Sequence, residues 1–271
     1  MKRRSQLFVP SISEKMIRKS VEINADSIIF DLEDAVPPED KERARDLLSK
    51  LLKELEWGRM KKELCVRINS LQLLDSYQDI SFISREDKIS CIVVPKAEND
   101  LSFLHKATGK TLIPLIETAK GVVKIEDIVR SKGVVGISYG IADLSLSLGG
   151  DYTFYENNQY IKTIIVTTAR AYDVDAIDKV YFDLKNMEGF RKECVEAKKL
   201  GYVGKQVIHP SQVDIANEVF SPTKEEMEWA KKVIEAYENA KKEGRGAIRL
   251  DDKLIDYVHY KIARKIAEFQ E

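Results

Sequence analysis

The first residues that could do chemistry are carboxylates that directly follow an apolar run. In "SIIFDLEDAV", from Ser27 to Val36, a segment typical of a buried strand leads into Asp31, Glu33 and Asp34. Three carboxylates this close together repel one another and resist burial. A polar loop after a strand would explain them, and so would an anionic site that binds a cation. The stretch by itself does not decide between these two interpretations.

Further polar side chains stand at the ends of other apolar runs. They are Arg67 and Asn69 in "CVRIN", Lys96 and Glu98 in "VVPKAE", Glu117 in "LIPLIET", Asp143 in "SYGIADL", and Lys205, Gln206 and His209 in "GKQVIHP". Taken singly, each has an ordinary structural explanation, such as helix capping, an ion pair or a turn. Their repeated position after apolar runs indicates a shared site.

The elements that would position these residues are short strands alternating with helices. The apolar runs are "QLFVP", "SIIFD", "LCVRI", "CIVVP", "LIPLI", "VVGISYG", "AIDKVYF" and "GKQVI". Between them lie amphipathic segments such as residues 37–55, which begin with two prolines, and "NMEGFRKECVEAKKLG", which ends in Gly201. This alternation predicts a parallel sheet, and its count and length favour a (β/α)8 TIM barrel over an open sheet.

A barrel would bring the polar residues to one rim, because active sites of (β/α)8 barrels lie at the carboxyl ends of the strands. A metal ion and Arg67 would then offset the repulsion among the carboxylates. Oxygen ligands suit Mg²⁺ or Mn²⁺ rather than Zn²⁺, and His105, His209 and His259 lack the spacing of a zinc site. The residues alone therefore predict a metal-dependent barrel enzyme.

Composition limits the class of protein. The 271 residues are 44% hydrophobic and 33% charged, with a formal net charge of −1, which indicates a soluble globular protein. This charge gives no bulk attraction to nucleic acid or to an anionic membrane. We expect a cytoplasmic protein, because no apolar run could span a bilayer and "LFVP" is too short for a signal peptide. Cys65, Cys91 and Cys194 are far apart and fit a reducing compartment.

The pattern changes near Ser221. Thr223 and Glu226 have the spacing of a capping box, a helix follows, and a last helix begins near Tyr257 after the glycine-containing connector "KKEGRGAIRLDDKLID". We therefore expect a barrel catalytic domain at residues 1–220. Residues 221–271 would form a C-terminal helical segment that serves as a lid, as an oligomer contact, or as both.

Several motifs together resemble a known family. "RRSQLFVP", "ADSIIFDLEDAVPPEDKERAR", "VRIN", "VVPKAE", "LIPLIETAKGV", "YGIADLSLSLGG", "AIDKVYFDL" and "GYVGKQVIHPSQV" resemble, in this order, the citrate lyase β-subunit-like proteins. These belong with malyl-CoA and citramalyl-CoA lyases in the HpcH/HpaI aldolase superfamily. The resemblance implies a (β/α)8 barrel that cleaves or forms a carbon–carbon bond in a 3-hydroxyacyl thioester such as citryl-, malyl- or citramalyl-CoA. The products would be an acetyl thioester and an oxo acid.

The resemblance also implies roles for individual residues. Glu117 of "IET" and Asp143 of "GIADL" would bind Mg²⁺, and Glu117 would also line the substrate site. Arg67 of "VRIN" would contact a carboxylate or carbonyl of the substrate and stabilise the enolate of the departing acetyl thioester. Glu33 and Asp34 of "DLEDA" would lie beside the substrate and hold waters of the metal.

Two positions depart from the family pattern. Ser11 stands where relatives usually have the glycine of "FVPG", which bears on how closely the first loop approaches a ligand. Ala142 stands where a glutamate often precedes the aspartate, so one carboxylate beside Asp143 is lost. That loss bears on substrate choice or on metal affinity.

The C-terminal segment is expected to complete the site. In malyl-CoA lyase-like relatives the aspartate matching Asp256 of "DKLID" reaches the active site of a neighbouring subunit, where it serves as acid or base. We therefore expect a homotrimer with Asp256 acting in trans, the alternative being a helix cap. The basic cluster of Arg4, Lys15, Arg18 and Lys19 is expected to bind the phosphates of CoA, the alternative being a solvated helix face.

Two other functions stay open at this point. One is an aldolase that acts on a free 2-oxo acid such as pyruvate, without CoA. The other is a non-catalytic thioester-binding subunit, which Ala142 would mark and which intact Glu117, Asp143 and Arg67 argue against. Either CoA or an acyl-carrier protein could present the thioester.

Overall fold

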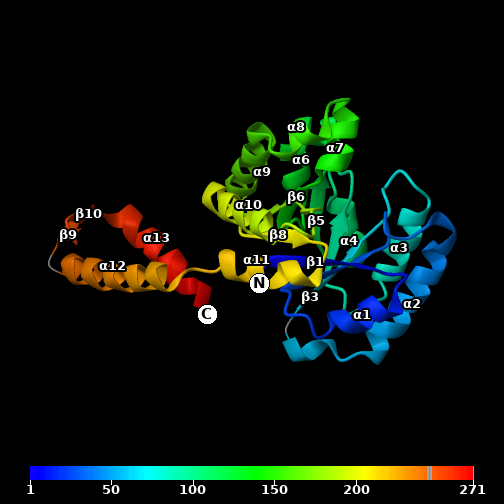
Figure 1. Cartoon of the computed structure of the whole chain (residues 1–271), viewed down its shortest axis with the longest axis horizontal. Helices are drawn as coiled ribbons and strands as arrows, with labels where there is room; N and C mark the ends of the chain where they lie inside the picture. The colour runs from blue at the N-terminus through cyan, green and yellow to red at the C-terminus, as the bar shows by residue number, and fades with distance from the viewer. Residues whose placement is uncertain (61, 243, 245, 271) are drawn as a thin grey trace. The chain divides into compact units, whose positions relative to one another are not determined.

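Eight parallel strands close into a barrel in the computed structural model of this chain, which describes residues 1–60, 62–242, 244 and 246–270 (Figure 1). The strands are β1 (Ser5–Pro10), β2 (Ser27–Asp31), β3 (Glu63–Arg67), β4 (Cys91–Val94), β5 (Thr111–Ile116), β6 (Gly136–Tyr139), β7 (Asp175–Asp178) and β8 (Gly204–Val207). Each strand pairs with the next, and β8 closes the barrel on β1 with Gln6 opposite Gln206. The predicted (β/α)8 barrel is confirmed, and each predicted run overlaps one strand.

Helices alternate with the strands along residues 1–220 and lie outside the barrel (Figure 1). They are α1 (Glu14–Ser20), α2 (Lys41–Glu54), α3 (Asp75–Ile83), α4 (Ser102–Thr108), α5 (Ala119–Val123), α6 (Ile125–Val129), α7 (Ile141–Leu148), α8 (Tyr152–Glu156), α9 (Gln159–Ala171), α10 (Met187–Leu200) and α11 (Pro210–Val219), with the short 3-10 helices η1 (Pro38–Asp40) and η2 (Trp57–Met60). The helix predicted at residues 37–55 corresponds to η1 and α2. Helix α10 ends at Gly201, whose φ of +112° is a conformation that glycine adopts at little cost.

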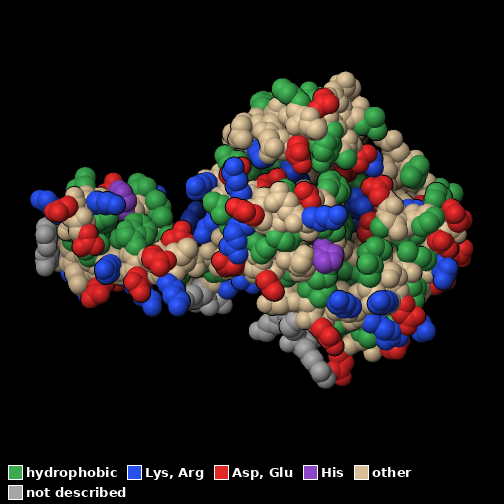
Figure 2. Space-filling view, viewed as in Figure 1, with side chains coloured by type: hydrophobic (Ala, Val, Ile, Leu, Met, Phe, Trp, Pro, Cys, Tyr) green, Lys and Arg blue, Asp and Glu red, His purple; other side chains and the backbone are tan. Residues whose placement is uncertain are grey.

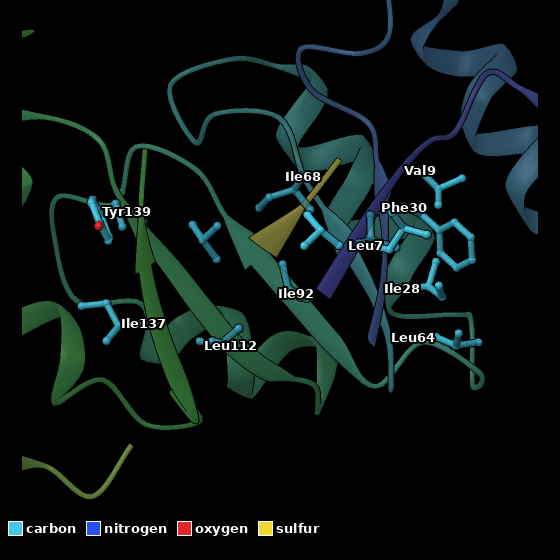
Figure 3. Close-up of a cluster of buried hydrophobic side chains, with 14 of the residues drawn as sticks. Leu7, Val9, Ile28, Phe30, Leu64, Ile68, Ile92, Leu112, Ile137 and Tyr139 are labelled. Carbon is cyan, nitrogen blue, oxygen red and sulfur yellow. The ribbon is translucent and has the colours of Figure 1, made fainter. Parts of the chain in front are cut away.

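Successive strand residues point alternately into the barrel and towards the helices. The interior cluster consists of Ile29, Cys65, Cys91, Val93, Ile113, Leu115 and Ile177. Their strand neighbours belong to the larger cluster between strands and helices, including Leu7, Val9, Ile28, Phe30, Leu64 and Ile92 (Figure 3). Burial on both faces explains why the strands are continuous apolar runs. Residues two positions apart in a strand point to the same side. Asp31, Arg67 and Glu117 each stand two positions after an interior residue, so their side chains point towards the barrel mouth.

A fully buried ion network lies outside the barrel between β7, β8 and α10. The Lys205 ammonium contacts Asp178 Oδ2 and Glu193 Oε1, both at 2.5 Å. Lys179 Nζ contacts the same Glu193 oxygen at 2.9 Å, and the Tyr139 hydroxyl donates to Asp178 at 2.8 Å. Burial lowers the pKa of Lys205, but the two carboxylates outweigh it and raise that pKa above its ordinary value. The network therefore stays charged and joins β6, β7, β8 and α10.

Residues 221–271 form a second unit, with α12 (Lys224–Lys242), β9 (Ile248–Leu250), β10 (Lys253–Ile255), α13 (Tyr257–Ala267) and η3 (Glu268–Gln270). The predicted capping box is present: Glu226 N–H donates to Thr223 Oγ1 at 3.1 Å, and Thr223 N–H donates to Glu226 Oε2 at 2.8 Å. The two helices pack through a small core that contains Ala230, Val233 and Ala263.

The predicted connector between these helices contains a β-hairpin that the sequence analysis did not predict. Strands β9 and β10 are antiparallel, with Leu250 opposite Lys253. Asp251 and Asp252 form the turn with φ of +46° and +61°, which is the left-handed conformation that two-residue hairpin turns require. The strands were missed because each has only three residues and the turn lacks the usual glycine. Residues 243 and 245 of the connector lie outside the described residues.

Basic and acidic side chains are interspersed over the face of the molecule shown in Figure 2, in keeping with the net charge of −1. None of the helices in the described part of the chain is both long enough and apolar enough to cross a membrane. Cys65, Cys91 and Cys194 are buried free thiols.

Candidate active site

The barrel mouth holds an acidic cavity of about 390 Å³ at the carboxyl ends of the strands. Its polar lining comes from Asp31 at the end of β2, Asp34 after it, Arg67 at the end of β3, Glu117 after β5 and Asp143 in the first turn of α7. A second cavity, of about 630 Å³, lies towards the loops after β2 and β3 and also has Asp34 in its wall. The closed barrel thus brings together residues more than a hundred positions apart in sequence.

Arg67 is the central cation of the cavity. Its Nε and Nη2 donate to the two oxygens of Asp31 at 2.8 and 2.6 Å, and its Nη1 lies 3.0 Å from Glu33 Oε2 and 3.4 Å from Asp34 Oδ2. The guanidinium also lies over the Phe8 ring, 5.0 Å from its centre. Burial lowers the pKa of Arg67, but Asp31 and Glu33 more than reverse this effect. Arg67 is therefore a permanently charged group held in one orientation.

Lys96 lies in the wall of the second cavity and is the other cationic group beside these carboxylates. Its Nζ lies 2.8 Å from Glu33 Oε1 and 3.5 Å from Asp143 Oδ1, and its backbone N–H donates to Glu117 Oε2 at 2.9 Å. The backbone φ of +48° is uncommon for a residue with a side chain. The sequence placed Lys96 at the rim but gave it no role. Its left-handed backbone, which aims the N–H at Glu117, has no sequence signal.

Glu117 is a buried carboxylate, with 4% of its surface exposed. Burial and the nearby Glu33 raise its pKa to about 7, although Arg67 and the Lys96 N–H oppose the increase. Gly140 makes room for it, since a Cβ at that position would lie only 2.5 Å from Glu117 Oε1. A cation bound beside this carboxylate would stabilise its ionised form and lower its pKa.

The residues present fit a divalent cation. The carboxylates of Asp31, Glu33, Asp34, Glu117 and Asp143 outnumber the nearby basic groups of Arg67, Lys96 and Lys41, so the site has excess negative charge when all five are ionised. Glu33 Oε2 is buried and accepts no well-aligned hydrogen bond from any described residue, although Arg67 Nη1 lies 3.0 Å from it. All the donor atoms are oxygens, which favours Mg²⁺ or Mn²⁺.

Lys41 and Asp31 are two residues whose contribution the sequence analysis missed. Lys41, the first residue of α2, donates from Nζ to the carbonyls of Leu32 and Glu33 at 2.7 and 2.6 Å, which fixes the loop that carries Glu33. Asp31 was grouped with the rim carboxylates, but it is the partner of Arg67. The pairing of Asp31 with Arg67 could have been proposed from the sequence, because the two residues end neighbouring strands.

The structure does not bring Arg4 to this site. Arg4 precedes β1, at the opposite end of the barrel, and pairs with Asp26 through contacts of 2.7 and 2.8 Å. Its expected role with CoA phosphates is therefore unsupported by its position. Lys15 is exposed in the first turn of α1, which follows the carboxyl end of β1. Arg18 pairs with Glu14 and Glu54 on the surface.

Other polar residues expected at the rim have structural roles. Lys205 points outward into the buried network, and Gln206 points into the barrel beside Gln6. His209 caps α11 through Nδ1, which accepts from Ser211 N–H at 3.2 Å. Asn69 donates to Asp79 from both its backbone and its side chain at 2.7 Å.

The two positions that depart from the family pattern lie close to the cavity. Ser11 is buried after β1, where its N–H donates to the Asp31 carbonyl at 3.0 Å, and its hydroxyl has no partner among the described residues. Ala142 lines the cavity directly beside Asp143. The missing carboxylate is therefore missing from the cavity wall itself.

Asp256 belongs to the second unit and caps α13. Its side chain accepts from Val258 N–H at 2.9 Å and from His259 N–H at 3.2 Å, and the His259 ring lies 2.7 Å from the same oxygen. His259 lowers the pKa of Asp256, so this carboxyl stays ionised. The capping role weighed in the sequence analysis is thus present. Capping occupies one carboxylate oxygen and leaves the side chain 45% exposed.

Together the barrel and its acidic mouth define a (β/α)8-barrel protein with a site of the kind that binds a divalent cation and an anionic substrate. The model of the HpcH/HpaI aldolase/citrate lyase family matches residues 4–210. The chain belongs to this family, which confirms the resemblance seen in the sequence.

The chain is similar to relatives along almost its whole length. It is 34% identical to a (3S)-malyl-CoA thioesterase of Cereibacter sphaeroides, over 97% of this chain and 92% of that protein. It is 32% identical to the mitochondrial citramalyl-CoA lyase of Rattus norvegicus, over 97% of this chain and 85% of that one. Among solved structures it resembles CitE of Mycobacterium tuberculosis in complex with magnesium, acetoacetate and coenzyme A, with a TM-score of 0.80 and 26% identity over 97% and 96% of the two chains.

Proposed function

We propose that this chain is a Mg²⁺-dependent carbon–carbon lyase that acts on a 3-hydroxyacyl-CoA thioester and yields an acetyl thioester and an oxo acid. The main observation in support is that Glu117, Asp143 and Arg67 line one cavity in a barrel of the HpcH/HpaI aldolase/citrate lyase family. Relatives named for citramalyl-CoA cleavage, and a similar structure that holds magnesium and coenzyme A, support the same chemistry.

Glu117 and Asp143 are the proposed ligands of Mg²⁺, and Glu33 and Asp34, which lie beside Arg67, would hold waters of the metal. When bound, the cation supplies a Lewis acid that polarises oxygens of the oxo-acid portion. Arg67 faces the cavity with Nη1, while Asp31 holds the opposite side of its guanidinium. This fixed positive charge would stabilise a substrate carboxylate and the negative charge that develops as the carbon–carbon bond breaks.

Asp256 is the proposed acid or base, contributed in trans within a homotrimer. Support comes from its exposed side chain, because a general acid or base must be accessible to the substrate. A segment that arrives late and excludes water would shield the enolate from bulk solvent until the proposed acid delivers the proton that converts it to the acetyl thioester. Lys15 remains the proposed contact for CoA phosphates. We also expect the protein to work in the cytoplasm, where free thiols stay reduced.

A second function is favoured by the relatives named (3S)-malyl-CoA thioesterase. A thioesterase cleaves the C–S bond and leaves the hydroxy acid intact, whereas a lyase cleaves the C–C bond and leaves the thioester intact. The two reactions need the same anchoring of a hydroxyacyl carboxylate, so the cavity by itself fits both. Identification of the products separates them.

The decisive experiment incubates the protein and Mg²⁺ with malyl-, citramalyl- and citryl-CoA and identifies the products by mass spectrometry. Acetyl-CoA with an oxo acid supports the lyase, and free CoA with an intact hydroxy acid supports the thioesterase. Aldol products from pyruvate without CoA would point to the free oxo-acid aldolase. Thermal stabilisation by acetyl-CoA without turnover of any substrate would point to a non-catalytic thioester-binding subunit.

A further inference from the structure

Lys96 places a fixed positive charge among the carboxylates at which a metal ion would bind. Its Nζ lies between Glu33 Oε1 at 2.8 Å and Asp143 Oδ1 at 3.5 Å. Its backbone N–H donates to Glu117 Oε2 at 2.9 Å. One residue therefore contacts both proposed metal ligands, the first through the backbone and the second through the side chain.

The position of Lys96 is fixed by more than its side chain. The backbone φ of +48° is held although it is unfavourable for a residue with a Cβ, and the N–H is aimed at Glu117 in this conformation. Glu33, which anchors the ammonium, is itself only 6% exposed and also contacts Arg67. The ammonium thus cannot move far from the site while Glu33 stays ionised.

We propose that Lys96 is a positioning residue that acts as an internal counter-ion, which holds the carboxylates together without metal and weakens the binding of a divalent cation by competing for Asp143. This inference rests on the proposed roles of Glu117 and Asp143 as metal ligands. It gives Lys96, which the sequence placed at the rim without a role, an effect on metal affinity.

The competition follows from charge and distance. A cation bound by Asp143 would lie within a few ångströms of the ammonium, because that ammonium is already 3.5 Å from Asp143 Oδ1. Two positive charges this close repel each other, so the ammonium beside Asp143 opposes metal binding there. Glu33 retains the ammonium nearby, so the repulsion persists in the metal-bound state. Removal of the charge should therefore tighten metal binding and destabilise the metal-free protein.

The test compares Lys96→Met with the wild type by calorimetric titration of Mn²⁺ and Mg²⁺ into metal-free protein, and by thermal unfolding in EDTA. We expect Lys96→Met to bind the cation about tenfold more tightly, since the charge of a site tunes its affinity, and to unfold at a lower temperature without metal. Lys96→Arg, which keeps the charge, should bind within about threefold of the wild type. Lys120→Met is the matched control, because Lys120 pairs with Glu98 on the adjacent loop at 3.1 Å.

Lys96→Met should thus strengthen metal binding while it lowers the unfolding temperature without metal. A residue that only supports the fold would not strengthen metal binding when it is replaced. If Lys96→Met binds the cation as the wild type does or more weakly, the proposal is wrong. If Lys96→Met does not fold, Lys96→Gln, which can still donate to Glu33, provides the same comparison. A wild type that binds no cation would overturn both this proposal and the metal site on which it rests, whereas metal binding without lyase activity would overturn only the proposed reaction.

Discussion

Asp31 and Arg67 are direct neighbours in the register of β2 and β3, and the guanidinium donates to both oxygens of the carboxylate at 2.8 and 2.6 Å. The edge of the guanidinium formed by Nε and Nη2 is therefore already bound to Asp31. Nη1 remains for the cavity, where it lies near Glu33 and Asp34. The substrate contact of Arg67 is thus expected from the opposite edge of the guanidinium, with Asp31 fixing its angle.

Replacement of Arg67 by lysine should lower kcat/KM about a hundredfold, because loss of a donor of this kind costs roughly 3 kcal/mol of transition-state stabilisation. Lysine keeps the charge but cannot contact Asp31 at both oxygens and also reach into the cavity. Steady-state kinetics with the identified thioester measures the effect. Arg191→Lys, at an exposed ion pair with Glu218, is the control. Near-full kcat/KM in Arg67→Lys would exclude the role.

Glu117→Gln and Asp143→Asn should each lose metal binding and metal-dependent activity while remaining folded. The amides keep the shape of the side chains but remove the negative charge that the cation needs. We expect a loss of metal affinity larger than the roughly 10–100-fold that removal of an outer-shell partner costs. Titration with Mn²⁺ measures affinity, and circular dichroism checks the fold. Glu98→Gln, on the loop after β4, should bind metal like the wild type. A magnesium complex whose ligands include neither residue would contradict the assignment.

The stability of the metal-free protein should decrease as pH rises from about 4.5 to 7. Burial and Glu33 raise the pKa of Glu117 from 4.5 to about 7, so the folded protein holds this proton more tightly than the unfolded chain does. The stabilisation is complete below the unfolded pKa and is lost as pH rises through the folded one, which amounts to about 3 kcal/mol. Urea unfolding in EDTA at several pH values measures it. Glu117→Gln should reduce the slope and leave the contributions of Glu33 and Asp79, whose pKa values burial also raises. An unchanged slope would show that Glu117 does not titrate in this range.

Lys205→Met should destabilise the barrel by about 3–5 kcal/mol, because it leaves the buried Asp178 and Glu193 carboxylates without their shared cation. Chemical unfolding monitored by circular dichroism gives the free energy of unfolding. The control is Arg191→Met, which removes an exposed ion pair with Glu218 between α10 and α11 and should cost less than about 1 kcal/mol. Equal effects of the two substitutions would show that burial of the Lys205 network adds nothing.

Mixed subunits should regain activity if Asp256 acts in trans. Asp256→Ala chains lack the proposed acid or base, and Glu117→Ala chains lack a proposed metal ligand, so each is expected to be inactive alone. After subunit exchange, some sites would combine an intact Glu117 with an intact Asp256 from the neighbour. Light scattering measures the oligomeric state, and tagged chains verify exchange. Full activity of Asp256→Ala alone, or no recovery despite exchange, would refute the role.

The order of elements and the end of the barrel that holds the site could be predicted from the sequence. Strands buried on both faces have to be continuous apolar runs, and helices with one buried face have to be amphipathic, so the alternation specified the barrel. The carboxyl ends of parallel strands meet on one rim, which placed Asp31, Arg67, Glu117 and Asp143 together.

Which strand-end residues face the cavity was decided only by the tertiary structure. Lys205 and Gln206 are adjacent in β8, yet the lysine points outward to Asp178 and the glutamine points inward beside Gln6. The sequence does not reveal this alternation, because both faces of the strand are buried and nothing marks which parity points inward. Asp31 can pair with Arg67 only because both side chains point to the inner side of the barrel, which the sequence does not show. The left-handed backbone of Lys96 depends instead on Glu117, which lies 21 residues away and becomes its neighbour only when the barrel closes.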